Sequence, residues 1–276
     1  MAASRGKLFV VATPIGNLDD LTPRAREVLA SADVIAAEDT RHTLGLLSRI
    51  GVESRLIAYH EHNERERVAE LLERLLSGAT VALVSDAGTP LISDPGWRLV
   101  HAAREQGIDV GPVPGPSAAI AALCVAGLPT DRFVFEGFLP RGDSARAARL
   151  RDLRSERRTI VLYESVHRVA DTLAALVEHF GADRRAVLAR ELTKIHEQIR
   201  SGTLAELAAS LGSDIPLLGE FVLVVAGNPS DAAVDEARAN EIYAALSAEL
   251  DPTKALQLTA TITGIPRNAL YKLLRT

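Results

Sequence analysis

Short apolar runs rich in β-branched residues alternate with segments of helical spacing over residues 7–126, and this alternation restricts the fold more than any other feature. The runs typical of strands cover residues 8–11, 34–37, 55–58, 81–84 and 110–113. Between them, apolar residues recur three and four positions apart, as Leu71 and Leu75 do. Thr22-Pro23 and Pro95 are helix start signals. The pattern predicts an α/β fold with a largely parallel sheet covered by helices.

Leu128-Pro129-Thr130-Asp131 breaks this pattern, and a second set of predicted strands follows it. These strands cover residues 133–138, 159–163, 186–189 and 221–226. Thr203 and Glu206 have the spacing of a capping box. Asp251-Pro252 and Ile265-Pro266 divide the last segment into about three helices. We therefore predict an α/β domain over 1–128, a second α/β domain over 129–228 and a helical tail over 229–276.

Composition excludes several classes of protein. The net charge is −5, which argues against a nucleic-acid binder held mainly by bulk positive charge. With 47% apolar residues the chain is globular rather than disordered. Cys124 is the only cysteine, which rules out internal disulfides and cysteine-rich zinc sites, and its apolar surroundings predict a buried small hydrophobe. No segment has the length or pattern of a membrane span or a signal peptide, so we expect a soluble, cytoplasmic protein.

Three rigid loops follow predicted strands of the first domain. The first contains Pro14 and Gly16, the second runs from Ser85 to Gly96, and the third is Pro114-Gly115-Pro116-Ser117-Ala118. None of them matches the glycine fingerprint of dinucleotide sites or the phosphate-binding loop of nucleotide hydrolases. Because ligands of open α/β sheets bind at the carboxyl ends of strands, the three loops predict a pocket at that edge.

Six motifs in order carry a family resemblance. They are Ala12-Thr13-Pro14-Ile15-Gly16-Asn17-Leu18, Glu38-Asp39-Thr40-Arg41, Leu83-Val84-Ser85-Asp86-Ala87-Gly88-Thr89-Pro90, Pro114-Gly115-Pro116-Ser117, Tyr163-Glu164-Ser165 with His167-Arg168, and Arg190-Glu191-Leu192-Thr193-Lys194. With these motifs the chain resembles the ribosomal RNA small subunit methyltransferase I family, which belongs to the tetrapyrrole-methylase-like superfamily of S-adenosylmethionine enzymes. The resemblance covers about residues 7–227.

The resemblance implies two α/β domains of tetrapyrrole-methylase type, with S-adenosylmethionine in a cleft between them as methyl donor. It also implies 2′-O-methylation of a cytidine ribose in the decoding region of small-subunit rRNA, as naked rRNA or in the small ribosomal subunit, by a homodimer. Tyr163 and Leu192 of the second domain would close over the cofactor. The residues expected to bind it are Pro14, Ser85, Asp86, Ala87, Gly88, Thr89, Ser117, Ala118, Tyr163 and Leu192.

Methyl transfer to a hydroxyl needs alignment and removal of a proton. Glu38, Asp39 and Arg41 follow the second predicted strand, and Lys194 follows a strand of the second domain. We assign these four residues to catalysis. A helix N-terminus capped by Asp39 or Thr40 explains the first cluster equally well.

Residues 141–158 hold seven arginines and three acidic residues. Ion pairs along a solvated helix explain about half of this charge. We expect the rest to contact RNA phosphates beside the cofactor cleft, extended by Arg267, Lys272 and Arg275 of the tail. The RNA-binding residues expected are Arg141, Arg157, Arg158, His167 and Arg168.

Other functions stay open. His60 and His62 share one face of an extended segment but have no third clear ligand, so we expect no metal site. A tetrapyrrole methyltransferase of corrin biosynthesis would use the same fold and cofactor on another substrate. A non-catalytic ribosome-assembly factor would keep the fold alone, but it would have no need for the three cofactor loops.

Overall fold

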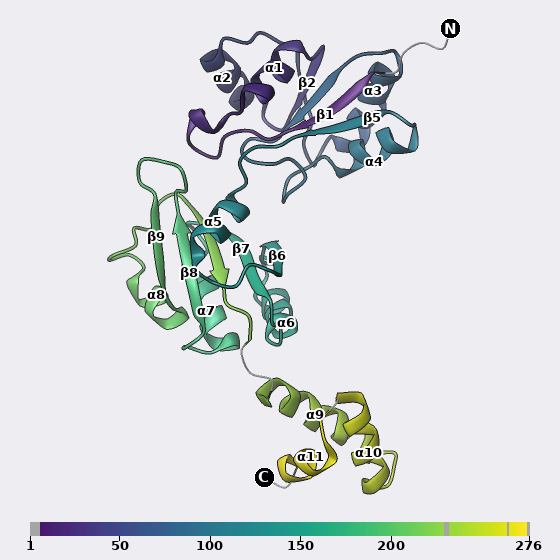
Figure 1. Ribbon diagram of the computed structural model, residues 1–276, viewed down its shortest axis with the longest axis vertical. Coiled ribbons are helices and arrows are strands. Elements are labelled where there is room, and N and C mark those ends of the chain that lie inside the picture. The colour runs from purple at the N-terminus through teal and green to yellow at the C-terminus, as the bar shows by residue number, and fades with distance from the viewer. Residues whose placement is uncertain (1–5, 229–231, 264, 275–276) are drawn as a thin grey trace.

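The computed structural model describes residues 6–228, 232–263 and 265–274. It contains two sheets that follow one another along the chain, and a group of helices at the C-terminal end (Figure 1). The fold class predicted from the sequence is confirmed. None of the helices in these ranges combines the length and the apolar character that crossing a bilayer requires.

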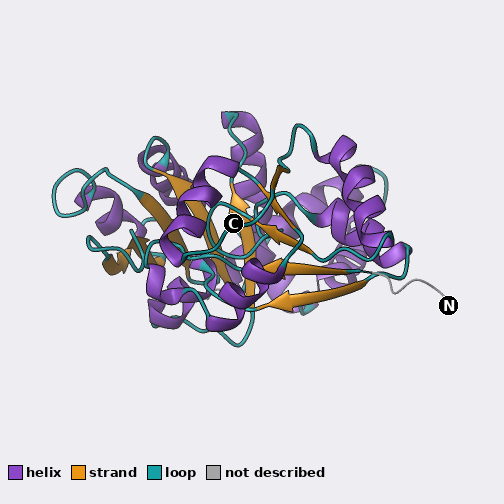
Figure 2. Cartoon of the chain, turned by 90° about the horizontal axis from the view of Figure 1, so that it is seen from above, coloured by secondary structure: helices purple, strands orange, loops and turns teal. Residues whose placement is uncertain are grey.

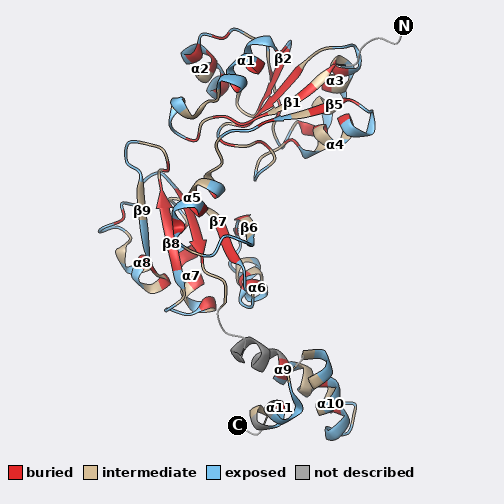
Figure 3. Ribbon diagram, in the orientation of Figure 1, coloured by how far each residue is buried: buried red, intermediate tan, exposed pale blue. Residues whose placement is uncertain are grey.

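The first sheet is parallel throughout and has the order β3-β2-β4-β1-β5. Its strands are β1 (Lys7–Val11), β2 (Val34–Ala37), β3 (Leu56–Ala58), β4 (Val81–Val84) and β5 (Asp109–Val113). In β2, Val34 and Ala36 face one core cluster while Ile35 and Ala37 face the other. Burial on both faces explains why β2 and β4 are continuous apolar runs (Figure 3).

Helices cover both faces of this sheet (Figure 1, Figure 2). On one face lie α1 (Pro23–Ser31) and α2 (Thr40–Ile50), and on the other α3 (Glu64–Leu76) and α4 (Trp97–Glu105). A short 3-10 turn, η1 (Leu18–Asp20), precedes α1. The Thr22 side chain accepts a hydrogen bond from the Ala25 amide, which confirms the predicted start of α1. The start predicted at Pro95 is wrong, because α4 begins at Trp97 after Gly96, whose φ is 140°.

The second sheet is mixed and has the order β6-β7-β10-β8-β9. Its strands are β6 (Phe133–Phe138), β7 (Thr159–Ser165), β8 (Arg185–Arg190), β9 (Gln198–Thr203) and β10 (Glu220–Val225). Only the pair β6–β7 is parallel. The sequence analysis missed β9, because this edge strand is polar and largely exposed and so lacks an apolar signal.

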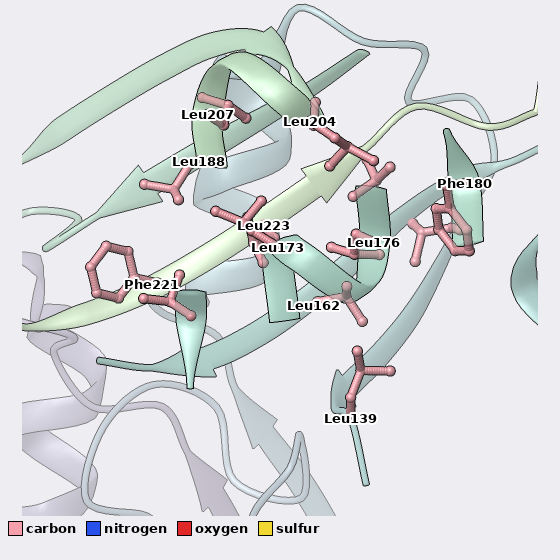
Figure 4. Close-up of a cluster of buried hydrophobic side chains, with 14 of the residues drawn as sticks. Leu139, Leu162, Leu173, Leu176, Phe180, Leu188, Leu204, Leu207, Phe221 and Leu223 are labelled. Atoms are coloured by element: carbon pink, nitrogen blue, oxygen red, sulfur yellow. The ribbon is translucent and has the colours of Figure 1, made fainter. Parts of the chain in front are cut away.

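Three helices, α6 (Asp143–Leu153), α7 (Val169–Phe180) and α8 (Leu204–Ser210), cover one face of this sheet. Leucines from all three pack on Leu162, Leu188 and Leu223 (Figure 4). The capping box predicted for α8 is present, with Thr203 and Glu206 each bonded to the other's backbone amide.

The opposite face is covered by α5 (Ala118–Ala126), which lies within the range 1–128 that we assign to the first domain. Its alanines and Leu123 pack on Val161 and Val224. Cys124 points away from this sheet and is exposed, so the prediction of a buried cysteine is wrong. The helix is apolar on nearly all sides, and its composition therefore does not reveal which face is buried.

The C-terminal segment forms α9 (Ala232–Ser247), α10 (Pro252–Thr263) and α11 (Arg267–Leu273). These helices pack on one another, with Ala239, Ala255 and Leu270 fully buried (Figure 1). The division predicted at Pro252 and Pro266 is confirmed, since α10 begins at Pro252 and α11 directly follows Pro266.

Candidate functional site

A cavity of about 380 Å³ opens between the carboxyl edge of the first sheet and the second sheet, and we call it the first cavity. Its volume lies within the range of small-molecule sites, roughly 300–1,000 Å³. The first sheet and its loops contribute Ile15, Glu38, Asp86, Ala87, Gly88, Thr89, Ile92, Ser93, Asp94, Ser117 and Ala118. The second sheet and its edges contribute Phe138, Tyr163, Glu164, Ser165, Ala189, Leu192, Glu220, Phe221 and Val222.

Direct hydrogen bonds hold the three predicted loops together. The backbones of Thr13 and Gly88 exchange two hydrogen bonds of 2.8 and 3.0 Å. Gly88 has a φ of 79°, a left-handed conformation that favours glycine. The Thr89 hydroxyl donates to the carbonyl of Pro116 at 3.0 Å, and the Thr13 hydroxyl donates to that of Ser85 at 3.2 Å. The loops therefore form one rigid wall of the first cavity.

Tyr163 and Leu192 form part of the opposite wall. The Tyr163 hydroxyl accepts a hydrogen bond of 3.1 Å from the amide of Ala119, at the start of α5. Its ring packs edge-on against Phe135 and Phe138, and burial raises the pKa of its hydroxyl. Leu192 is 8% exposed and belongs to the same cluster as Ile15. Cavity walls thus come from both halves of the chain, as the resemblance implied.

Backbone strain gathers at this site. The described non-glycine residues with positive φ are Leu91, Ser93, Glu191 and Thr193. Ser93 lines the first cavity, Leu91 adjoins it, and Glu191 and Thr193 flank its lining residue Leu192. Left-handed conformations of such residues cost of order 1–3 kcal/mol each and persist where the surrounding structure imposes them. Their concentration in two loops around one cavity is a pattern typical of functional sites.

Carboxylates dominate the polar lining of the first cavity. Glu38, Asp86 and Asp94 lie close enough for their charges to interact. Burial, followed by the charge of Glu38, raises the pKa of Asp94 to about 6, although the Ser85 hydroxyl partly offsets this. Burial and then the charge of Asp86 raise the pKa of Glu38. With a pKa of about 6, Asp94 can exchange protons near neutral pH.

Asp94 is a candidate that the sequence analysis did not select. Its position in the same glycine- and proline-rich loop as Asp86 was the available signal, but nothing in the sequence shows that the loop folds back to bring the two carboxylates together. Glu38, which was selected, does line the cavity. Pro14 and Ser85 are not among its lining residues; Pro14 lines a neighbouring cavity, and Ser85 supports the loop from behind.

The structure gives Asp39 a capping role. Its Oδ1 accepts a hydrogen bond of 2.8 Å from the Arg41 amide at the start of α2. The Arg41 guanidinium pairs with the same carboxylate at 3.1 Å and lowers its pKa. Asp39 does not appear among the described residues that line either cavity. The capping interpretation that the sequence left open therefore explains this residue.

We expect Asp39→Asn to leave methyl transfer nearly unchanged and Asp39→Ala to lower the urea concentration at the midpoint of unfolding. Asparagine caps helices as well as aspartate does, whereas alanine leaves amides of the first turn unpaired. Urea unfolding and single-turnover rates check both variants. A large rate loss in Asp39→Asn with normal stability would return Asp39 to the mechanism.

Lys194 is held by two carboxylates. Its Nζ donates to Glu191 Oε1 at 2.8 Å and to Glu220 Oε2 at 3.0 Å, and these contacts raise its pKa despite partial burial. Lys194 is therefore a cation at neutral pH and no proton acceptor. It lines the neighbouring cavity together with Arg41.

The arginine-rich segment departs from the prediction. Arg158 makes a bidentate pair with Glu156 at 2.8 and 2.7 Å, and Arg149 makes another with Glu136. We expected Arg157 and Arg158 to be available for RNA phosphates, but Arg158 is already paired: its contact with Glu156 forms just beyond α6, where helical spacing does not apply. Arg157 is not without a partner either.

The location of Arg157 and Arg158 also differs from the expectation. Both precede β7, whereas residues 163–165 at the other end of that strand line the first cavity. A strand of this length places them about 20 Å from the cavity. Arg141 follows β6 at the near end, and there the Arg168 guanidinium donates to the carbonyls of Leu139 and Pro140.

The remaining predicted RNA contacts have mixed outcomes. Arg168 supports the loop after β6 and is only 21% exposed, which leaves it little surface for a ligand. His167 is exposed at the start of α7, and Arg267 is exposed on α11. The side chain of Lys272 and the whole of Arg275 lie outside the described residues.

Comparison with known proteins defines the class. A family model described as tetrapyrrole (corrin/porphyrin) methylases matches residues 7–208, and one described as the RsmI C-terminal HTH domain matches residues 233–275. The uroporphyrin-III C-methyltransferase from Thermus thermophilus has a similar fold, with a TM-score of 0.54 and 26% identity over 80% of this chain and 94% of that one. The chain thus has the fold of a methyltransferase of this type.

Curated relatives give the narrower assignment. A ribosomal RNA small subunit methyltransferase I from Xylella fastidiosa is 53% identical over 96% of this chain and 98% of its own length. One from Pseudomonas aeruginosa is 52% identical over 98% of this chain and 96% of its own length. The chain belongs to the ribosomal RNA small subunit methyltransferase I family.

Proposed function

We propose that this protein transfers a methyl group from S-adenosylmethionine to the ribose 2′-hydroxyl of a cytidine in the decoding region of small-subunit rRNA. The names of the relatives support rRNA as substrate. The choice of cytidine and of the 2′-hydroxyl rests on the family resemblance. A cytoplasmic location and a homodimeric state belong to the same proposal.

The main support for S-adenosylmethionine as the methyl donor is the negative charge of the residues that line the first cavity. Its lining contains Glu38, Asp86, Asp94, Glu164 and Glu220, and none of the described lining residues is a lysine or an arginine. Such a site fits a ligand with a sulfonium and an ammonium group and disfavours cofactors that carry phosphates. A uroporphyrin-III C-methyltransferase with the same fold was solved in complex with S-adenyl homocysteine, at 20% identity and a TM-score of 0.55.

The residues present also fit the rest of this donor. Ile15, Ala189 and Leu192 supply apolar surface for an adenine ring, and the turn at Gly88 exposes backbone groups. S-adenosylmethionine supplies an activated methyl group when bound, so the protein has to align the acceptor and remove its proton. We assign the proton acceptor role to Asp94, with Glu38 and Asp86 beside it.

The acidic site of this chain argues against a non-catalytic assembly factor, which would have no use for a strained, carboxylate-lined cavity. A tetrapyrrole methyltransferase shares the fold, but the helical C-terminal segment matches a model described as a helix-turn-helix domain. Helix-turn-helix units commonly bind nucleic acids. We therefore favour the RNA substrate.

Two measurements test the proposal. Calorimetry should show binding of S-adenosylmethionine, and no binding at millimolar concentration would exclude the donor. Mass mapping of rRNA nucleosides from cells with and without the gene should show one 2′-O-methylcytidine that depends on the protein. Unchanged rRNA together with methylation of uroporphyrinogen III would favour the tetrapyrrole alternative.

A further inference from the structure

A second cavity of about 460 Å³ adjoins the first, and the function proposed above does not use it. The two cavities share Ile15, Asp86, Ala87 and Glu220 in their linings. The other residues that line the second cavity are Pro14, Gly16, Leu18, Arg41, His42, Gly45, Leu46, Arg49 and Lys194. A ligand in the second cavity would therefore contact a ligand in the first cavity near Asp86 and Ala87.

The two linings differ in charge, because the second cavity adds three cations to the shared carboxylates Asp86 and Glu220. Arg41, Arg49 and Lys194 line the second cavity, whereas only carboxylates represent the charged residues in the described lining of the first. The chain as a whole is acidic, so this is a local concentration of positive charge. It favours an anionic ligand beside a cationic one.

Three residues on one side of α2 line the second cavity. Arg41, Gly45 and Arg49 follow one another at intervals of four and so lie on one side of the helix. Arg41 pairs with Asp39, yet 91% of its side chain is exposed. The Arg49 side chain is exposed and forms no hydrogen bond or ion pair with any residue that the structure describes. Both guanidinium groups are therefore accessible to a ligand.

Gly45 has no structural reason to be glycine. It lies inside α2, where glycine is roughly 0.5–1 kcal/mol less favourable than alanine. A Cβ atom at this position would meet nothing within 4 Å, and no unusual φ requires glycine there. The missing side chain instead widens the second cavity between the two arginines. This arrangement lets the backbone of a ligand approach the helix closely.

Lys194 completes the site from the second sheet. Its stem crosses Gly16, where a Cβ would lie only 2.3 Å from Lys194 Cγ, so this glycine is needed for the lysine to reach the cavity. One of its two partners, Glu220, is 77% exposed and can turn away into solvent. The ammonium group can then pair with an incoming anion.

We propose that the second cavity binds the phosphodiester backbone of the RNA next to the nucleotide that is methylated. Arg41 and Arg49 contact phosphate oxygens, Gly45 admits the backbone between them, and Lys194 contacts it from the opposite side. This inference rests on the function proposed above, and it names the part of the protein that holds the acceptor strand. Arginine suits this role because its guanidinium binds phosphate in a bidentate manner.

The test compares Arg49→Ala with Arg65→Ala. Arg65 is an exposed arginine on α3, which covers the opposite face of the first sheet, and its side chain likewise forms no hydrogen bond or ion pair with the residues that the structure describes. Binding of small ribosomal subunits from cells that lack this protein is measured over a range of salt concentrations. Arg49→Ala should weaken binding about an order of magnitude at 0.1 M salt. It should also reduce the slope of the logarithm of the binding constant against the logarithm of the salt concentration by roughly one unit, while Arg65→Ala should change neither.

Gly45→Leu is a second variant, which should increase the stability of the protein but decrease its affinity for the subunits. It should raise the melting temperature, because leucine favours a helix, and it should weaken binding of the subunits by filling the cavity. Calorimetry should give unchanged affinity for S-adenosylmethionine in both variants. Normal salt slopes in Arg49→Ala together with normal binding in Gly45→Leu would overturn the inference.

The same experiment separates this inference from the proposed function. Subunit binding is read without catalysis, whereas methyl incorporation by the unaltered protein tests the reaction. Salt-sensitive binding through Arg49 without any methylation would contradict the proposed function alone. Normal methylation with no effect of either variant on subunit binding would contradict the phosphate site alone. If the unaltered protein binds uroporphyrinogen III and Arg49→Ala does not, the second cavity binds a tetrapyrrole carboxylate and the phosphate site is overturned.

Discussion

Replacing Asp94 with asparagine is expected to slow methyl transfer by roughly 10²–10⁴-fold, the usual contribution of a positioned base. Asparagine keeps the shape of the side chain but cannot accept a proton from the acceptor hydroxyl. Binding of S-adenosylmethionine should change less than the rate. Single-turnover rates at pH 7 measure the effect, with Asp39→Asn as the matched control because that carboxylate caps a helix near the same edge of the sheet.

The pH profile gives the same prediction a second readout. The pKa of Asp94 is raised to about 6, so the carboxyl becomes protonated and inactive as pH falls through that value. The single-turnover rate of the unaltered protein should therefore fall about tenfold per unit below pH 6, and Asp94→Asn should lose this dependence. A rate within threefold of normal in Asp94→Asn would remove Asp94 from the mechanism.

The stability of the folded protein should change with pH in the direction opposite to the methyl-transfer rate. Because the pKa of Asp94 is raised in the folded state, the folded protein binds this proton more tightly than the unfolded chain does. The contribution of Asp94 to stability therefore falls as pH rises from about 4 to about 6 and stays low above that. Asp94→Asn removes the buried charge and should raise the melting temperature at pH 7 while it lowers activity, a common trade-off at active sites.

Gly88→Val is expected to lower affinity for S-adenosylmethionine at least tenfold while the protein remains folded. The φ of 79° at Gly88 is unfavourable for a β-branched residue, at a cost of about 1–3 kcal/mol. A new Cβ would also lie 3.4 Å from Ile15 Cγ2, at the wall of the first cavity. The turn that joins Thr13 to Gly88 should therefore shift. Calorimetry measures the affinity and circular dichroism checks the fold.

Gly51→Val is the control for backbone strain. Gly51 ends α2 with a φ of 66°, and a Cβ there would meet nothing within 4 Å. This variant should lose a similar amount of stability and keep normal cofactor affinity. Equal loss of affinity in both variants would show that general destabilisation, and not the cavity wall, explains the result for Gly88.

Prediction from sequence succeeded where local chemistry repeats a known pattern. The strands β2 and β4 are buried on both faces, so their apolar runs were visible in the sequence. The capping box of α8, together with Pro252 and Pro266, marked the starts of helices. Glycine and proline in the loops likewise indicated the wall of the first cavity, because few other residues adopt such turns. The polar edge strand β9 lacked any such signal.

The amino-acid sequence by itself thus determined the order of the elements other than β9, the class of fold, the family and the loops that form one side of the site. Tertiary structure alone decided which charges meet. It brought Asp94 to Glu38 and Asp86, and set Arg49 and Lys194 on opposite sides of a second cavity. The physical reason is that electrostatic interactions depend on distance through space, and residues far apart in the chain share no pattern that records it.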